Sequence, residues 1–276
     1  MGSLRYKALL FVALLALATS CAPINQGVAF PKARVKETKL VALDPFADEV
    51  RVGLLLELNN PNPFPLPLLE SELTGRLGTM RAAATLPALT LPAGGSRETW
   101  VELRGSLTGA LDTAVRLVRG EELPLELSGR LAAEVAGRKL YLGPKTLLRE
   151  RVRFSLSILP PKIEPLAFKA RLSGTELLFS VRYRAKNQTP VGYLAQGELA
   201  AKVGGYALGQ VPLSLKLPPL GESEGELVLR VSLFSLPAAI TRALEGSPVE
   251  LSGHLKVAIP GVYEALYPIR LVGVLR

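Results

Sequence analysis

Residues 50–66 read VRVGLLLELNNPNPFPL, and this stretch contains both signals that decide the fold. Its first part alternates apolar and other residues: Val50, Val52, Leu54, Leu56 and Leu58 against Arg51, Gly53, Leu55, Glu57 and Asn59. A period of two is typical of a strand with one buried face. Two Asn-Pro pairs follow, and each proline lacks an amide donor and forces extended geometry on the residue before it. We therefore predict a half-buried strand and then a rigid turn, whose free backbone groups the asparagine amides can cap.

The same alternation recurs along the rest of the chain, at residues 123–135, 152–158, 177–183 and 249–259. Turn signals rich in Pro and Gly separate these runs, at residues 61–67, 92–95, 143–144, 204–205 and 218–221. With 48% hydrophobic residues the chain can bury real cores, and with 6% aromatics these cores must be aliphatic. The pattern predicts an all-β protein made of antiparallel strands.

The chain also repeats itself at an offset of 126 residues. Residues 89–92 (LTLP) match residues 215–218 (LKLP), and Gly78, Gly95 and Gly120 match Gly204, Gly221 and Gly246. Such agreement in register indicates a tandem duplication. We predict two tandem seven-stranded antiparallel β-sandwiches.

One segment in each copy departs from the strand period. Leu111, Ala114, Val115 and Val118 have helical spacing and precede Gly120. In the second copy, Ser235 could cap a helix with Pro237 in its first turn, before Gly246. Each sandwich is therefore expected to carry one short α-helix.

The turn at Asn60, Pro61, Asn62, Pro63 and Phe64 is also a family marker. Together with the following strand-like segment 68–78 and a Glu-x-x-Val-x-Leu strand at residues 98–103, it resembles the WHy (water stress and hypersensitive response) domain of type 2 late-embryogenesis-abundant (LEA) proteins. The resemblance covers residues 38–158 well. The second copy has only Asn187 and Pro190 at the motif position, so its resemblance rests mainly on the repeat.

The resemblance implies a compact seven-stranded sandwich with one helix, similar in architecture to a fibronectin type III domain. It also implies association with desiccation and other abiotic stress, and protection of proteins or membranes. The family has no known catalytic residue, so none can be transferred to this sequence.

The N-terminal residues predict export and lipidation. Residues 1–7 carry Arg5 and Lys7, an apolar run follows at residues 8–18, and Cys21 closes the segment 18–21 (ATSC). This resembles the lipobox of bacterial lipoproteins, in which the cysteine is acylated and the signal is cut before it. The alternative is an ordinary secretory signal with an incidental cysteine.

These signals divide the chain into a signal peptide (1–20), a lipidated tether (21–37), a first domain (38–158), a Pro-rich linker (159–165) and a divergent second domain (166–276). The chain is expected to be anchored to the bacterial cell envelope. Which membrane holds it, and its oligomeric state, stay open.

The residues that catalysis needs are sparse. The one histidine, His254, falls on the polar phase of its strand, and the pairs Glu70 and Glu72 and Glu121 and Glu122 read as solvated charges. Metal sites need converging His, Cys or carboxylate ligands, so no metal, cofactor or enzymatic activity is expected. The net charge of +9 comes from scattered residues without a basic run, so nucleic acid is not expected as a partner.

Three functions therefore remain. The first is a non-catalytic envelope lipoprotein of the stress-protection type, with client proteins or lipids as partners. The second is a module that binds or transfers a lipid or another hydrophobic ligand, because the Leu-rich strands hold more apolar residues than one buried face requires. The third is a structural or adhesive spacer.

Overall fold

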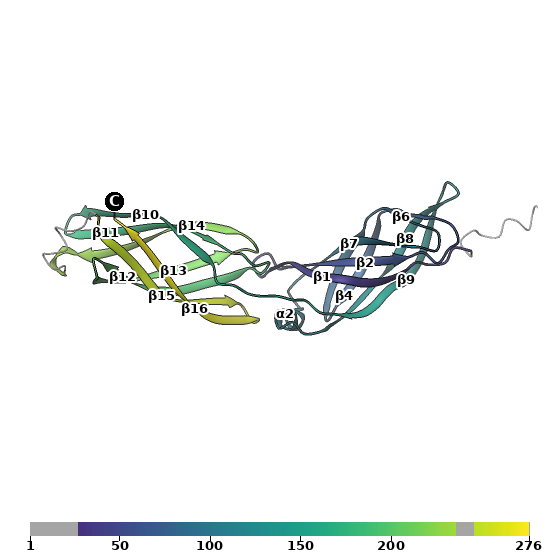
Figure 1. Ribbon diagram of the computed structural model, residues 1–276. Helices are drawn as coiled ribbons and strands as arrows, with labels where there is room; N and C mark the ends of the chain where they lie inside the picture. The colour runs from purple at the N-terminus through teal and green to yellow at the C-terminus, as the bar shows by residue number, and fades with distance from the viewer. Residues whose placement is uncertain (1–26, 236–245, 276) are drawn as a thin grey trace, which may run out of the picture.

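The computed structural model describes residues 27–235 and 246–275 of the 276-residue chain. Almost all regular structure in these residues is β, and every pairing between the named strands is antiparallel. The all-β prediction is confirmed. Figure 1 shows two β units placed end to end, here named the first half (residues 32–152) and the second half (residues 162–274).

The first half forms one nine-stranded sheet. Its order is β1-β2-β7-β5-β4-β8-β3-β6, and β9 pairs with β8. The long strands are β1 (Lys32–Asp44), β2 (Glu49–Asn59), β4 (Ser71–Leu77), β5 (Met80–Leu86), β7 (Ser96–Gly105), β8 (Leu123–Val135) and β9 (Arg138–Val152). Two further strands have three residues each, β3 (Leu66–Leu68) and β6 (Leu89–Leu91). The first half therefore has nine strands where seven were predicted, and strands of three residues are too short to show a period in the sequence.

The second half has seven strands in two sheets. One sheet has the order β10-β11-β14, with β10 (Lys162–Ser173), β11 (Glu176–Lys186) and β14 (Glu222–Ser232). The other has the order β13-β12-β15-β16, with β12 (Tyr193–Val203), β13 (Tyr206–Leu217), β15 (Pro248–Ile259) and β16 (Tyr263–Val274). Buried side chains of both sheets line one small cavity, so the sheets face each other.

Alternation of buried and exposed side chains explains why these segments are strands. In β4 and in β5 every second residue is buried, and in β2 Val52, Leu54, Leu56 and Leu58 are fully buried. Leu, Val and Ala dominate the core, as the low aromatic content predicts. Burial of such side chains is the main stabilising contribution, about 1.5–3 kcal/mol for each large aliphatic residue.

The first predicted helix is observed as α2 (Leu111–Val118), between β7 and β8. Ala114 and Leu117 are buried, and Gly120 follows the helix with φ +66°. The second predicted helix falls in residues 236–245 and lies outside the described residues. Only its expected start is described, in the 3₁₀ turn η2 (Leu233–Ser235).

Two strands begin earlier than the sequence indicated. β1 includes residues 32–37, which were assigned to the tether, and β10 includes residues 162–165, which were assigned to the linker. In both segments backbone pairing with the next strand supplies the structure: Lys32 pairs with Asn59 and Lys162 with Lys186.

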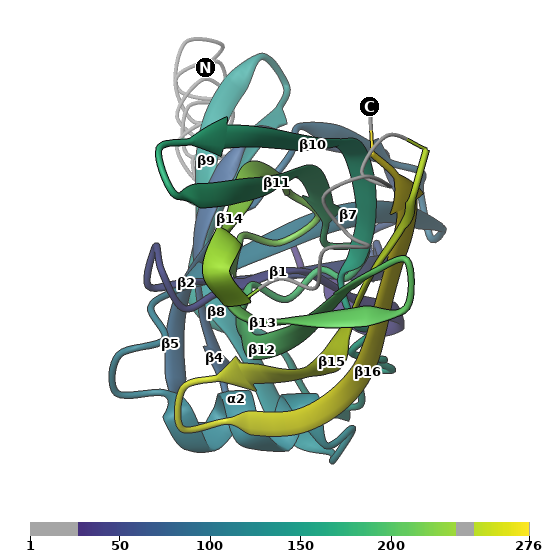
Figure 2. The ribbon, with the colours of Figure 1, turned by 90° about the vertical axis from the view of Figure 1, so that its left-hand side faces the viewer.

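The two halves touch through the tip of the β1–β2 hairpin. The Leu43 amide donates to Pro190 O, and the Gly192 amide donates to Leu43 O, both at 2.8 Å. Nearby, Lys216 Nζ lies 4.5 Å from the centre of the Phe46 ring. Figure 2, viewed along the molecule from the second half, shows β1 behind the strands of that half.

Candidate functional site: the two Asn-Pro turns

The first Asn-Pro turn is organised by Asn60, which is 0% exposed. Its Nδ2 donates to Phe64 O at 2.8 Å and to Pro92 O at 3.0 Å. Its Oδ1 accepts from the Asn62 amide at 3.0 Å and from Asn62 Nδ2 at 2.8 Å. Its own amide donates to Gly95 O at 2.8 Å. The asparagine caps the free backbone groups of the turn, as predicted.

The second half repeats this arrangement around Asn187, which is also 0% exposed. Its Nδ2 donates to Val191 O at 2.7 Å and to Pro218 O at 2.9 Å. Its Oδ1 accepts from the Thr189 amide at 2.9 Å and from Thr189 Oγ1 at 2.8 Å. Its amide donates to Gly221 O at 2.8 Å. Each bond has a counterpart in the first half, so the duplication extends to the hydrogen bonds of the turn.

Sequence reasoning missed Thr189. The threonine occupies the place of Asn62 and bonds to the same oxygen of the central asparagine through its hydroxyl and amide groups. The signal was present, because Ser, Thr, Asn and Asp form interchangeable local turns. Pro61 and Pro63 are exposed, while Phe64 is half-buried against the core.

Both turns hold a second segment of chain. In the first half, Asn62 Oδ1 accepts from the Ala29 amide at 2.8 Å and Asn62 Nδ2 donates to Ala29 O at 2.9 Å. In the second half, Pro190 O and the Gly192 amide bond to the backbone of Leu43. The side-chain nitrogen and oxygen of Asn60 and Asn187 both form hydrogen bonds within their own turns. The arrangement positions backbone segments.

The other candidate residues lie apart from the turns. His254, Glu70, Glu72, Glu121 and Glu122 are exposed. Cys21 lies outside the described residues. In residues 27–235 and 246–275, no group of three His, Cys, Asp or Glu residues could hold a metal ion. The helices among these residues are too short or too polar to cross a membrane.

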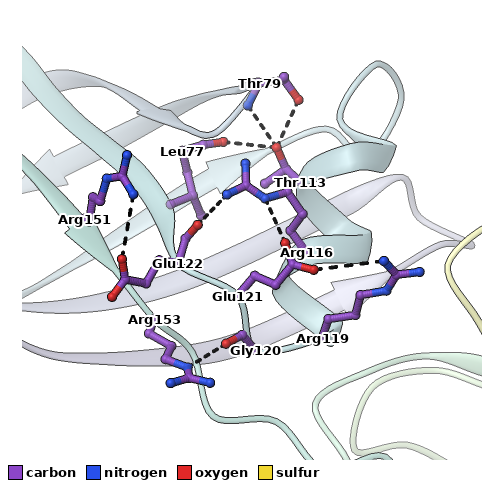
Figure 3. Close-up of polar contacts among 10 residues, drawn as sticks. All are labelled: Leu77, Thr79, Thr113, Arg116, Arg119, Gly120, Glu121, Glu122, Arg151 and Arg153. Carbon is purple, nitrogen blue, oxygen red and sulfur yellow. Dashed lines mark hydrogen bonds and ion pairs between the residues drawn. The ribbon is translucent and has the colours of Figure 1, made fainter.

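Glu121 and Glu122 belong to an ion-pair network at the C-terminal end of α2, drawn in Figure 3. Glu121 Oε2 lies 3.3 Å from Arg116 Nε, and Glu122 Oε2 lies 3.9 Å from Arg151. Arg153 Nε donates to Gly120 O at 2.6 Å, which satisfies a carbonyl that follows the helix. These carboxylates therefore help to fix the end of α2, in agreement with their interpretation as charged surface groups.

Thr113 fixes the other side of α2. Its Oγ1 accepts from the Thr79 amide at 2.9 Å and donates to Leu77 O at 3.3 Å, as Figure 3 shows. The hydroxyl is almost fully buried, and these bonds tie the helix to the β4–β5 turn. The helix is therefore held to the sheet by polar contacts as well as by Ala114 and Leu117.

Two tyrosines of the second half lie beside Ile158, in the segment that joins β9 to β10. Tyr267 donates to Ile158 O at 3.2 Å and lies 2.9 Å from the Tyr263 hydroxyl. Desolvation, and then the hydrogen bond with Tyr263, raise the pKa of Tyr267 to about 12. At neutral pH the phenol is therefore protonated and acts as a hydrogen-bond donor rather than as a base.

The apolar cavity between the two sheets of the second half is small. Its volume is 20 Å³. Its lining is entirely apolar: Phe179, Val181, Ala201, Val203, Leu208, Val211, Leu227, Leu229, Val249 and Leu251. A cavity of this size has room for about one water-sized sphere, whereas ligand pockets typically enclose about 300–1,000 Å³.

No family model and no curated protein matches the chain. Among solved structures, it is similar to a protein from Archaeoglobus fulgidus, with 13% identity, 48% of this chain and 99% of that chain covered, and a TM-score of 0.28. A red sea bream transglutaminase matches with 11% identity and a TM-score of 0.26, and the match covers 90% of this chain and 32% of the transglutaminase. A DUF4785 family protein from Legionella pneumophila matches with 17% identity and a TM-score of 0.21, and the match covers 86% of this chain and 56% of that protein. At these TM-scores the matches carry no argument about function.

Proposed function

We propose that the chain is a non-catalytic envelope lipoprotein that protects proteins or the membrane during desiccation and other abiotic stress. The observation that carries the proposal is the pair of Asn-Pro turns. In the first half, the two asparagines of the motif that resembles the WHy domain of type 2 LEA proteins are buried and hydrogen-bonded, and Asn187 repeats the contacts of Asn60 in the second half. A turn built twice in the same way supports two tandem copies of one domain.

In this proposal each half is a sandwich of the fibronectin type III kind. The second half supports it, because a three-stranded sheet faces a four-stranded one. The strands of the first half belong to one continuous sheet, so its assignment rests on the sequence repeat and on the repeated turn. An experimental structure of the two halves tests this assignment. A closed barrel in either half would contradict it.

The membrane anchor in this proposal is an acylated Cys21. Its support is the sequence 18–21 behind a short apolar run. Metabolic labelling with a radioactive fatty acid tests it: we expect label in the wild-type chain and in Ser20→Ala, and none in Cys21→Ser. Label that persists in Cys21→Ser would contradict the anchor.

The protective role is tested by drying and rehydrating cells that lack the gene. We expect reduced survival, restored by the wild-type chain and by Ser20→Ala but not by Cys21→Ser, because protection needs the chain at the membrane. Normal survival of the deletion strain would contradict the proposal. Drying the purified chain with a labile enzyme, and separately with dye-filled vesicles, distinguishes protection of proteins from protection of bilayers.

A structural spacer is the second candidate. The observation that favours it is the end-to-end placement of the halves in Figure 1, joined by two backbone hydrogen bonds at Leu43. In a spacer, lengthening or shortening the chain should change function with length, whereas a protectant should tolerate removal of one half. A lipid carrier needs room for an acyl chain, and the apolar cavity that the described residues enclose between the sheets of the second half, at 20 Å³, is far smaller than that. Native mass spectrometry for co-purified lipid tests that function.

A further inference from the structure

The Asn-Pro turn of the first half fixes where the N-terminal segment leaves the fold. Asn62 bonds to both backbone groups of Ala29, and Phe30 packs against the core and lies near Gly143 of β9. From Cys21 to Ala29 there are only eight residue steps, which span about 26–29 Å when fully extended. This step rests on the proposed acylation of Cys21. Given that anchor, this end of the first half stays within about 30 Å of the lipid.

The β8–β9 hairpin projects at the same end of the molecule, where β1 begins (Figure 1). Its loop consists of Ala136 and Gly137, which both have positive φ, +51° and +71°. Arg138 and Lys139 follow and are exposed, and Tyr141 is 58% exposed. A tight loop of this kind makes a short, stiff tip on two paired strands.

The tip combines cations with an amphipathic aromatic ring. Lys139 Nζ lies 5.2 Å from the centre of the Tyr141 ring, and Lys145 Nζ lies 6.0 Å from that of Phe30. Arg138, Lys139 and Lys145 form no ion pair with the described residues, and Glu134 is the one acid in the sequence from 127 to 149. Lys145 lies lower on β9, opposite Gly129 of β8. We name Arg138, Lys139 and Tyr141 the hairpin-tip patch.

This combination matches the chemistry of an anionic bilayer surface. Tyrosine is enriched at the headgroup level, where its ring meets apolar groups and its hydroxyl meets water. Lysine and arginine lay their stems along apolar surface while the charges stay with anionic headgroups. Each basic residue near such a surface strengthens binding about fivefold.

We propose that the hairpin-tip patch is a second membrane contact, which places Tyr141 among the headgroups of an anionic bilayer. The acyl chains fix one point of the molecule, and the hairpin fixes a second. Two contacts hold the first half against the lipid and direct the second half away from it.

Quenching by brominated lipids tests this contact in the complete, membrane-purified chain. Trp100 is the sole tryptophan of the sequence and lies in β7, which pairs with β2 and β5 rather than with β8 or β9. We expect the tryptophan introduced by Tyr141→Trp, in a Trp100→Phe background, to be quenched in vesicles of brominated phosphatidylcholine and phosphatidylglycerol. In the wild-type chain Trp100 should not be quenched. Equal quenching of both positions, or none at position 141, overturns the proposal.

Charge reversal supplies the matched comparison. Arg138→Glu with Lys139→Glu should lower the ratio of bound to free tip at least about 25-fold, since each cation contributes about fivefold. Lys169→Glu with Arg171→Glu makes the same change of net charge on exposed residues of β10 and should leave quenching unchanged. If the two double substitutions reduce quenching equally, the net charge of the protein, and not the hairpin tip, determines its attraction to the vesicles, and the proposed site is wrong.

The same vesicles separate this proposal from the anchor. A chain that floats with neutral vesicles but shows no quenching of the tip on anionic ones keeps the anchor and overturns the hairpin contact. A chain that floats only with anionic vesicles, and loses this on Arg138→Glu with Lys139→Glu, keeps the hairpin contact and overturns the anchor. Attachment to neither vesicle overturns both. Iodide, a soluble quencher, tests for a protein partner. If envelope proteins protect the tryptophan at position 141 from iodide and anionic vesicles do not, the tip binds a protein, and the membrane contact is wrong.

Discussion

A single buried amide organises one turn in each half of the molecule. Asn60 and Asn187 each bond to two backbone carbonyls on separate segments, and each also orders the residue two positions later. Aspartate has no donor for the carbonyls, and glutamine is one methylene longer. The side chain is therefore a structural requirement, which explains why the second copy retains Asn187 while Asn62 has become Thr189.

Substitution of Asn60 tests this role. Asn60→Ala leaves Phe64 O, Pro92 O and the Asn62 amide without their partner in a buried turn. We expect a loss of about 3 kcal/mol or more in the free energy of unfolding, because three groups lose their partner and each unsatisfied buried group costs about 1–3 kcal/mol. Urea unfolding followed by the fluorescence of Trp100, which lies in the same half, measures it.

The neighbouring asparagine is the control. Asn59 is exposed, and its Nδ2 donates to Ser96 Oγ at 3.2 Å. Asn59→Ala should change the free energy of unfolding by no more than about 0.5 kcal/mol. If the two variants unfold at the same urea concentration, the buried hydrogen bonds do not stabilise the turn.

Ala136 gives a prediction of opposite sign. It is exposed in the β8–β9 loop with φ +51°, a conformation that costs an L-residue about 1–2 kcal/mol. Asn before Gly is the preferred pair in such loops, so Ala136→Asn should stabilise the first half by about 0.5–1 kcal/mol. Ala136→Val should destabilise it, because a β-branched residue fits positive φ poorly. The urea midpoint should fall from Ala136→Asn through the parent chain to Ala136→Val. The reverse order would show that the positive φ of Ala136 does not strain the loop.

At the scale of elements, charge pairs align β11 with β14. The register places Lys186, Arg184 and Arg182 opposite Glu222, Glu224 and Glu226. Lys186 lies 2.9 Å from Glu222, and Arg184 lies 2.7 Å from Glu224. A slip by one residue would turn the buried face outward, and a slip by two would leave one of the three cations without an acid opposite it. The charge pairs therefore add a small preference for the observed register. Exposed pairs contribute little to stability at neutral pH.

These pairs predict a dependence of stability on acid. The hydrogen bond from Lys186, and then its charge, hold the pKa of Glu222 below its usual range. A carboxylate with a lowered folded pKa stabilises the fold above its unfolded pKa, near 4.5, and this contribution disappears as pH falls through the folded pKa. The urea midpoint, followed by circular dichroism, should therefore fall below pH 4.5 in the wild-type chain, and less steeply in Glu222→Gln.

Glu72 is the matched control for this titration. It is exposed on β4 and forms no ion pair with the described residues. Glu72→Gln should follow the wild-type curve. If Glu222→Gln follows it as well, the pair with Lys186 does not contribute.

Elements with a clear period were predictable from sequence, and those without one were not. The alternation in β2 and the helical spacing of α2 gave correct elements. Residues 32–37 of β1 are exposed or half-exposed on both faces, so their pairing with β2 leaves no pattern in the sequence. The prolines at 160, 161 and 165 indicated a linker, yet Pro165 lies at a bulge of β10, a strand paired on one side.

The same limit applies to the candidate site. The turn was predictable, because Asn-Pro pairs restrict the backbone locally. The docking partners of the two turns were not, because Ala29 bonds to the first turn and Leu43 to the second through backbone atoms. Hydrogen bonds to the backbone do not require a particular residue type, so they leave no pattern in the sequence. Long-range contacts of this kind can be found only in a three-dimensional structure.

At the scale of the whole molecule, hydrogen bonds within the first half hold the tip of the β1–β2 hairpin. Asp48 Oδ1 accepts from the Thr108 amide at 2.7 Å, and Asp48 Oδ2 accepts from Ser106 Oγ at 2.6 Å. Hydrogen bonds from Ser106 and then Thr108 lower the pKa of Asp48, so the carboxylate stays ionised. The tip is thus preorganised, and Leu43 docks without ordering a loose loop.

The junction itself is narrow, and Gly192 makes it close. A Cβ on Gly192 would lie 3.1 Å from a carbon of Pro219 and 3.3 Å from one of Pro45, so the larger side chain in Gly192→Val should force the halves apart. Spin labels at Thr74→Cys and Glu198→Cys, one in each half, measure this. We expect one narrow distance distribution in the parent chain and a broad one in Gly192→Val, because domains with few contacts move freely. Gln196→Val adds the same side chain on the exposed face of β12 and should keep the narrow distribution. A narrow distribution in Gly192→Val would mean that the contact at Leu43 does not hold the halves in line.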